Sequence, residues 1–270
     1  MRSGFLRQSL RIGALVLGCV IALFNQAATA DELTDALIRY AVHDYERAIE
    51  MLTPLADRGN AVAQMQLGLI HARGEGVPRD DVAAIDWLTR AAEQGQSEAQ
   101  FELGVMNRDG SGTPIDGKRA IYWFERAAEA GAPHAFNAIG EMYLGHPDIA
   151  QDYEMALIWF FRGAQLDNAD ALYNVGMRYL LGQGTERDEI EAYKWFDLAA
   201  DAGIGDVRSK AVSARQAIGE RLMPLQVWQA KIAARDWLRN RGSASASVET
   251  FMGRNSPNRP TALVRHRRIQ

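Results

Sequence analysis

Residues 61–96 read AVAQMQLGLIHARGEGVPRDDVAAIDWLTRAAEQGQ, and the three segments that follow repeat this pattern. Five columns of residues recur every 36 positions. They are tryptophan at 87, 123, 159 and 195, glycine at 68, 104, 140 and 176, alanine at 63, 99, 135 and 171, alanine at 84, 120, 156 and 192, and aspartate at 80, 116, 152 and 188. Self-similarity at one period indicates a repeat architecture. The sequence therefore predicts four repeats, at 61–96, 97–132, 133–168 and 169–204.

Each repeat contains two amphipathic stretches separated by a turn. Apolar residues between Ala63 and Ile70 follow a helical step, and a glycine-rich turn comes after them at 74–78. Asp80 or Asp81 is placed to cap a second helix, because a carboxylate accepts hydrogen bonds from unpaired backbone N–H groups. Gly95 ends that helix, since glycine tolerates a left-handed conformation. The pattern predicts a pair of helices in every repeat.

Small and large residues alternate in a way that suits helix packing. Glycines in the Gly68 column leave room for a neighbouring helix to approach, and the tryptophans fill the space between helices. A single helix pair cannot bury its apolar face alone, so stacked neighbours share a continuous core. The expected fold is an all-α, right-handed α-solenoid.

The repeat resembles the Sel1-like repeat family, a relative of the tetratricopeptide repeat. The residues that carry the resemblance in the first repeat are Ala63, Leu67-Gly68, Gly74-Glu75-Gly76-Val77, Asp80, Ala84, Trp87, Ala91-Ala92 and Gly95. Residues 31–60 look like a degenerate entry repeat. The third repeat departs from the pattern, with His146 and Asp148 in place of the turn glycines and with Gly163 and Asp167 in place of Ala and Gly. We therefore expect its turn to have a different shape.

The N-terminal thirty residues have the features of a secretory signal peptide. Three arginines precede an apolar run at 12–24, and Ala28 and Ala30 are the small residues before a cleavage site. Cleavage there gives a mature start at Asp31 and a periplasmic or secreted location. An uncleaved membrane anchor is an alternative, although the run is short for a span of about 20 residues. Cys19 suggests a lipoprotein site, but apolar residues still follow it.

The remaining ends differ in character from the repeats. Residues 205–241 read as two capping helices, with Pro224 suited to a first helical turn. Residues 242–270 are predicted to be a disordered basic tail. Without residues 1–30 the chain has 27 basic and 34 acidic residues, and the stretch 31–241 carries a net charge of −11. An acidic body argues against nucleic-acid binding, and no segment after the signal is apolar enough to span a membrane.

The sequence contains no recognisable catalytic, metal or cofactor site. The five histidines, at positions 43, 71, 134, 146 and 266, are scattered rather than set at zinc-ligand spacing. There is also no phosphate-binding loop and no nucleophile elbow. We therefore expect a protein that is not an enzyme and that has no cofactor.

The resemblance places the first helix of each pair along an inner groove. One inner column would contain Met65, Phe101, Asn137 and Tyr173, and a second would contain Leu69, Val105, Glu141 and Met177. Positions four apart share one helix face. Large, partly apolar residues there would suit an extended or helical peptide, and the alternative is that neighbouring repeats cover them.

These features favour an exported scaffold that binds another protein or peptide. The resemblance further implies a role in envelope signalling or exopolysaccharide regulation. An alternative is a cell-wall or polysaccharide binder that uses Tyr122, Tyr143 and Tyr193 as exposed aromatic residues. A hydrolase is the remaining alternative, although no constellation of residues supports it.

Overall fold

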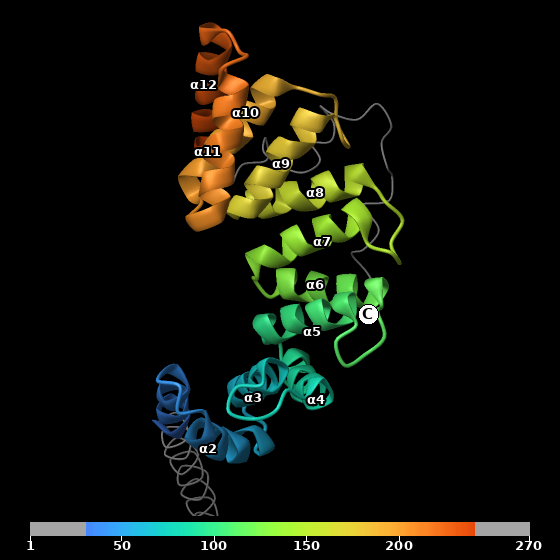
Figure 1. Ribbon diagram of the computed structural model, residues 1–270, viewed down its shortest axis with the longest axis vertical. Helices are drawn as coiled ribbons and strands as arrows, with labels where there is room; N and C mark the ends of the chain where they lie inside the picture. The colour runs from blue at the N-terminus through green and yellow to red at the C-terminus, as the bar shows by residue number, and fades with distance from the viewer. Residues whose placement is uncertain (1–30, 241–270) are drawn as a thin grey trace, which may run out of the picture. The chain divides into compact units, whose positions relative to one another are not determined.

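The computed structural model describes residues 31–240, where all regular secondary structure is helical (Figure 1). The predicted signal peptide at 1–30 and the predicted tail at 242–270 lie outside the described residues. The described chain forms two compact units, residues 31–106 with 111–113 and residues 107–110 with 114–240. Each unit encloses its own cluster of buried apolar side chains.

The helices begin at intervals of 36 residues, which is the period of the sequence. The first helices of the repeats are α3 (Ala61–Arg73), α5 (Ser97–Asp109), α7 (Pro133–Gly145) and α9 (Ala169–Leu181). The second helices are α4 (Asp81–Glu93), α6 (Gly117–Glu129), α8 (Tyr153–Ala164) and α10 (Glu189–Ala202). Residues 31–41 are helical and are followed by α2 (Tyr45–Asp57); α11 (Gly205–Gly219) and α12 (Pro224–Asn240) come last. The predicted all-α solenoid is confirmed.

The aspartate column begins the second helix of each repeat. Asp80, rather than Asp81, is the N-cap of α4, and its carboxylate accepts from the N–H groups of Val82 and Ala83. Asp116, Asp152 and Asp188 cap α6, α8 and α10 in the same way. The N–H of each aspartate also donates to a carbonyl near the end of the preceding helix, such as His71 O for Asp80, at 3.0 Å. One residue type therefore closes the turn and starts the next helix.

The glycine column allows the two helices of a repeat to touch. A Cβ atom on Gly68 would lie 2.6 Å from Leu88 Cγ, and one on Gly176 would lie 2.8 Å from Phe196 Cε1. Gly140 is equally close to Phe160, with 2.6 Å to Cδ1. The first helix packs on the second in each of these pairs. Any side chain in this column would push the helices apart.

The tryptophan column is core, as expected, and each of its four members carries a cation on one face. Trp123, Trp159 and Trp195 are buried, and Trp87 packs half-buried against the core of the first unit. In three repeats an arginine three residues later lies over the ring. The pairs are Arg90 on Trp87, Arg126 on Trp123 and Arg162 on Trp159, at 4.7, 5.3 and 4.5 Å from the ring centroid. In the fourth repeat Leu198 takes the position of the arginine, and Lys194 Nζ lies over the Trp195 ring instead, 4.6 Å from its centroid.

The turns pack against the second helix of the preceding repeat, and the residue sizes are matched there. Gly112 has φ +70°, and a Cβ on it would lie 2.7 Å from Asp81 Cβ. In the third repeat the turn carries His146 and Asp148, and the position that receives them is Gly117, where a Cβ would lie 2.7 Å from His146 Nδ1. The turn also differs in backbone, since α7 ends on an extended His146 whereas α3 ends on a left-handed Gly74. The expected departure of this turn is thus observed.

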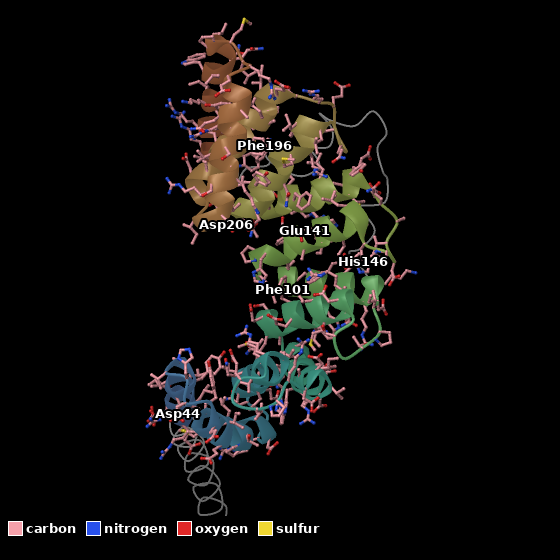
Figure 2. The ribbon with its side chains drawn as sticks, in the orientation of Figure 1. Asp44, Phe101, Glu141, His146, Phe196 and Asp206 are labelled. Carbon is pink, nitrogen blue, oxygen red and sulfur yellow. The ribbon has the colours of Figure 1, made fainter. Side chains whose placement is uncertain are left out.

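Polar contacts hold the third turn, whose His146 is labelled in Figure 2, in place. His146 Nε2 lies 3.2 Å from the carbonyl oxygen of Arg108, and the N–H of Gly117 donates to Asp148 Oδ2 at 3.4 Å. These contacts do not occur with a glycine turn, because they need the imidazole and the carboxylate. The larger turn residues are accommodated because the helix beneath them begins with glycine.

The last two helices lie against the fourth repeat (Figure 1). Both α11 and α12 pack on α10, and α12 begins at Pro224 as predicted. Trp237 of α12 contacts Trp195 and Phe161, with ring centroids 4.8 and 5.2 Å away. Trp237 therefore joins the core of the second unit at the repeat whose tryptophan has no arginine over it.

Replacing Gly140 with Ala is expected to destabilise the chain by about 2 kcal/mol, because the new methyl group overlaps the ring of Phe160. The matched control is Gly145→Ala at the end of the same helix, where a Cβ would meet nothing within 4 Å. Urea unfolding measures both changes. A Gly140→Ala variant as stable as the Gly145→Ala variant would contradict the close-approach argument.

Gly117→Ala is expected to destabilise the chain, and His146→Gly in the same molecule should restore part of the loss. The reason is that the imidazole lies where the new Cβ would project. A double-mutant cycle measures the coupling, which for residues in contact is about 0.5–3 kcal/mol. Strictly additive effects would show that the two residues are not matched in size.

Candidate functional site

In the first unit, the candidate groove residues lie on α3 and α5. Met65, Phe101 and Val105 are half-buried, whereas Leu69 is only 6% exposed. Leu69 therefore contributes packing rather than accessible surface. The other three keep a partly exposed apolar surface on the first helices, and Figure 2 labels Phe101 on α5.

A group of polar side chains at the edge of this surface was not identified from the sequence. Desolvation, reinforced by the charge of Glu98, raises the pKa of Glu102, while Arg73 opposes that rise. Arg73 Nη1 also donates to the hydroxyl of Tyr40, whose own proton goes to Glu75 Oε2 at 2.8 Å. Glu102 directly follows Phe101, so a partly desolvated carboxylate adjoins the apolar residue.

In the second unit, the candidate residues lie on α7 and α9 and are joined by side-chain hydrogen bonds. Asn137 Nδ2 donates to Glu141 Oε1 at 2.8 Å, and Asn174 Nδ2 donates to Asn137 Oδ1 at 2.8 Å. Tyr173 is half-buried, with its ring 5.3 Å from that of Phe196, and Met177 packs against the core cluster. The result is a polar row across two first helices, bordered by apolar side chains.

Asn174 is the member of this row that the sequence columns did not include. It lies 37 residues after Asn137, one position beyond the repeat period. Its Oδ1 has no hydrogen-bond partner among residues 31–240. The bond to Asn137 depends on how α9 lies on α7, which residue spacing alone does not give.

The charge of Glu141 is only partly balanced by its surroundings. Desolvation raises the pKa of Glu141, and the hydrogen bond from Asn137 and the charge of Arg108 oppose the rise. Arg108 itself forms a short ion pair with Asp109, 2.7 Å from Nε to Oδ1, and this bond holds the pKa of Asp109 below its ordinary value. The second-unit surface thus presents amides and a carboxylate whose desolvation its neighbours only partly offset.

The aromatic residues considered for polysaccharide binding do not form one exposed set. Tyr122 is 51% exposed, with Arg126 near its ring, and Tyr143 is half-buried. Tyr193 is only 6% exposed, because it packs into the core of the second unit. The expectation that Tyr193 is exposed was wrong.

Within residues 31–240, no group of three or more His, Cys, Asp or Glu side chains is arranged to hold a metal ion. None of the helices in this range is both long and apolar enough to cross a membrane.

Comparison with known proteins points to one family. The model of the Sel1 repeat matches residues 39–60, 61–96, 97–131, 135–168 and 169–204. The first of these stretches includes α2, in the region predicted as a degenerate entry repeat. None of the curated proteins compared with the chain matches it.

Two solved structures share both fold and sequence with the chain. One is a Sel1 repeat protein from Oxalobacter formigenes, with 28% identity, a TM-score of 0.62 and coverage of 77% of this chain and 87% of that one. The other is a protective antigen present in uropathogenic Escherichia coli strains, displaying an SLR fold, with 28% identity, a TM-score of 0.63 and coverage of 79% of this chain. The chain spans only 44% of the length of that antigen.

Glu102→Gln is expected to stabilise the chain at pH 7, by less than about 1 kcal/mol because the site is partly solvated. The pKa of Glu102 is higher in the folded chain than in the unfolded chain. Ionised Glu102 therefore lowers the free energy of unfolding at pH values above the folded pKa. At pH values below the unfolded pKa, Glu102 is protonated in both states and has no such effect. The gain should therefore vanish at about pH 3.5.

Thermal unfolding at the two pH values measures this difference. Glu93→Gln is the control, because Glu93 is exposed on the surface of α4. An equal gain at both pH values would show that desolvation of Glu102 is not its cause.

Proposed function

The chain belongs to the Sel1 repeat family, and we propose that it is an exported scaffold that binds a protein or peptide segment along the first helices of its repeats. Members of this family generally mediate protein–protein interaction. The family is also generally non-catalytic.

The observation that carries the proposal is the polar row on α7 and α9. An asparagine side chain has both a donor and an acceptor, so it can pair with the main chain of an extended peptide. Asn137 and Asn174 are already oriented by their mutual hydrogen bond, which lowers the entropy that binding would cost. The open Oδ1 of Asn174 is a free acceptor for a peptide N–H.

Apolar contacts on the surface of each unit would supply the affinity. In the second unit, Tyr173 and Met177 are held in place by the core and keep part of their surface exposed. In the first unit, Met65, Phe101 and Val105 offer the same kind of surface. Rigid, partly exposed apolar side chains next to ordered amides suit a peptide whose alternate residues face the scaffold.

Export and a role at the cell envelope complete the proposal. The arginines, the apolar run and the small residues of 1–30 support cleavage before Asp31. A repeat scaffold in that compartment would act by holding a component of envelope signalling or of exopolysaccharide production.

Affinity capture from a native envelope fraction tests this function. Two variants are expected to lower the amount of captured partner by about tenfold, which corresponds to a loss of roughly 1.4 kcal/mol of binding free energy. One is Asn137→Ala plus Asn174→Ala, and the other is Phe101→Ala. Tyr122→Ala is the matched control, since it removes an exposed aromatic residue from a second helix.

The outcomes separate the alternatives. A partner lost from the asparagine variant but retained by Tyr122→Ala supports binding along the first helices. Wall fragments in place of a protein, lost on Tyr122→Ala, would instead favour the polysaccharide-binding alternative. Capture that none of the variants alters would contradict the proposed surface.

A further inference from the structure

The second unit has a pocket of about 320 Å³ formed by α9, α10 and α12 and by the turn before α9. Its lining residues are Asp167, Leu172, Leu198, Asp201, Ala202, Trp237 and Leu238. This volume is at the lower end of the range of about 300–1,000 Å³ for ligand pockets, so it suits one side chain or a small ligand. None of the candidate groove residues lines it.

The pocket occurs where the end of the third repeat and the fourth repeat break the pattern of the others. Leu198 stands in the column of Arg90, Arg126 and Arg162, the arginines that lie over the tryptophans. Asp167 stands in the column of Gly59, Gly95 and Gly131 and keeps their left-handed backbone, with φ 58°. Leu198 thus places an apolar side chain where the other repeats have an arginine, Lys194 being the cation over Trp195, and Asp167 adds a carboxylate.

The pocket's chemistry restricts what can occupy it. An anion would be repelled by the carboxylates of Asp167 and Asp201, and a purely apolar group would leave the carboxylate of Asp201 without compensation. The side-chain carboxylate of Asp201 has no hydrogen bond or ion pair among residues 31–240. A cation with an aliphatic stem matches both features, because the stem packs on leucines while the head reaches the carboxylates.

Trp237 favours a guanidinium over an ammonium group. Arginine stacks on indole rings and is more weakly hydrated than lysine. An arginine against Trp237 would restore at this end of the chain the Arg–Trp pairing that the earlier repeats contain. The Nε1 of Trp237 is buried without a hydrogen-bond partner in the described residues.

From these observations the geometry points to an arginine-binding pocket, in which the guanidinium of a peptide lies on Trp237 between Asp167 and Asp201. This site is separate from the proposed groove and does not depend on it. Two sources could supply the arginine. One is another protein, and the other is the chain's own segment 242–270, which follows α12 and contains five arginines.

Charge and chain length make the chain's own segment a reasonable source. It has a net charge of +4, whereas residues 31–241 carry −11. Leu238 lines the pocket and Arg254 is 16 residues further along, a length that spans up to on the order of 50 Å when extended. Arginines of this segment can therefore reach the pocket of the same molecule.

The test uses the full-length chain labelled with ¹⁵N, and the indole N–H signal of Trp237 is assigned with Trp237→Phe. The probe is a synthetic peptide of residues 254–270, and its counterpart carries citrulline, the neutral isostere, in place of every arginine. A second full-length chain has glutamine at its five tail arginines, at 254, 259, 265, 267 and 268. We expect the arginine peptide to shift the Trp237 signal saturably and the citrulline peptide to leave it unchanged.

The charge variant is Asp167→Asn plus Asp201→Asn, which keeps the shape of the lining, and it should weaken binding by about tenfold. Its matched control is Glu93→Gln plus Glu129→Gln, because these residues share the Asp201 column in repeats that keep their arginine. The control should bind as the parent chain does. Dispersed spectra of both variants verify that they are folded.

Binding to the unmodified chain indicates an arginine from another molecule, and binding only to the glutamine-tail chain indicates that the chain's own segment already fills the pocket. Either result supports the site. The proposal is overturned if neither chain shows a shift, if citrulline binds equally well, or if the aspartate variant keeps its affinity. Failure here would leave capture through Asn137 and Asn174 unaffected, so the two proposals are tested independently.

Discussion

The close approach of two helices at a glycine is the constraint on which the rest of this structure depends. Gly68, Gly140 and Gly176 each bring a first helix into contact with a large side chain of the second, Leu88, Phe160 or Phe196. With this distance set, the tryptophans fill the remaining space and the capping aspartates begin each second helix at the same register. A repeat of 36 residues is thus a packing unit as well as a sequence period.

Where a turn packs against the preceding repeat, the side-chain sizes on the two sides are matched. A larger residue on one side is therefore accompanied by a smaller residue on the other. The third repeat has His146 where others have small turn residues, and the helix beneath begins with Gly117 instead of a larger residue such as Tyr45 or Asp81. At this junction the larger side chains lie in the turn and the glycine lies at the start of the helix, so the two positions exchange roles. Close-packed interiors require such compensation, because adding even one methylene group forces the neighbouring side chains to move.

The fourth repeat differs from the other repeats in the side chains around its tryptophan. Where an arginine would cover Trp195, the chain has Leu198, and Trp237 of α12 contacts the ring instead. Leu198 and Trp237 line a pocket together with Asp167 and Asp201. Each of the first three repeats is followed by another repeat, whereas α12 packs on the fourth. The inferred arginine site therefore belongs to the last repeat of the array.

The sequence by itself determined the all-α repeat fold, the helix pairs and the capping aspartates, because these follow from periodicity and from local backbone chemistry. It also placed the tryptophans in the core. Only the tertiary structure decided which surface residues act together, since Asn174 meets Asn137 one position out of register and Leu69 is covered by packing. The pocket at Trp237 likewise depends on how α12 lies on α10. Such contacts join residues that are out of register with the repeat or lie outside it. They depend on the angle at which helices pack, and the repeat pattern of the sequence does not specify that angle.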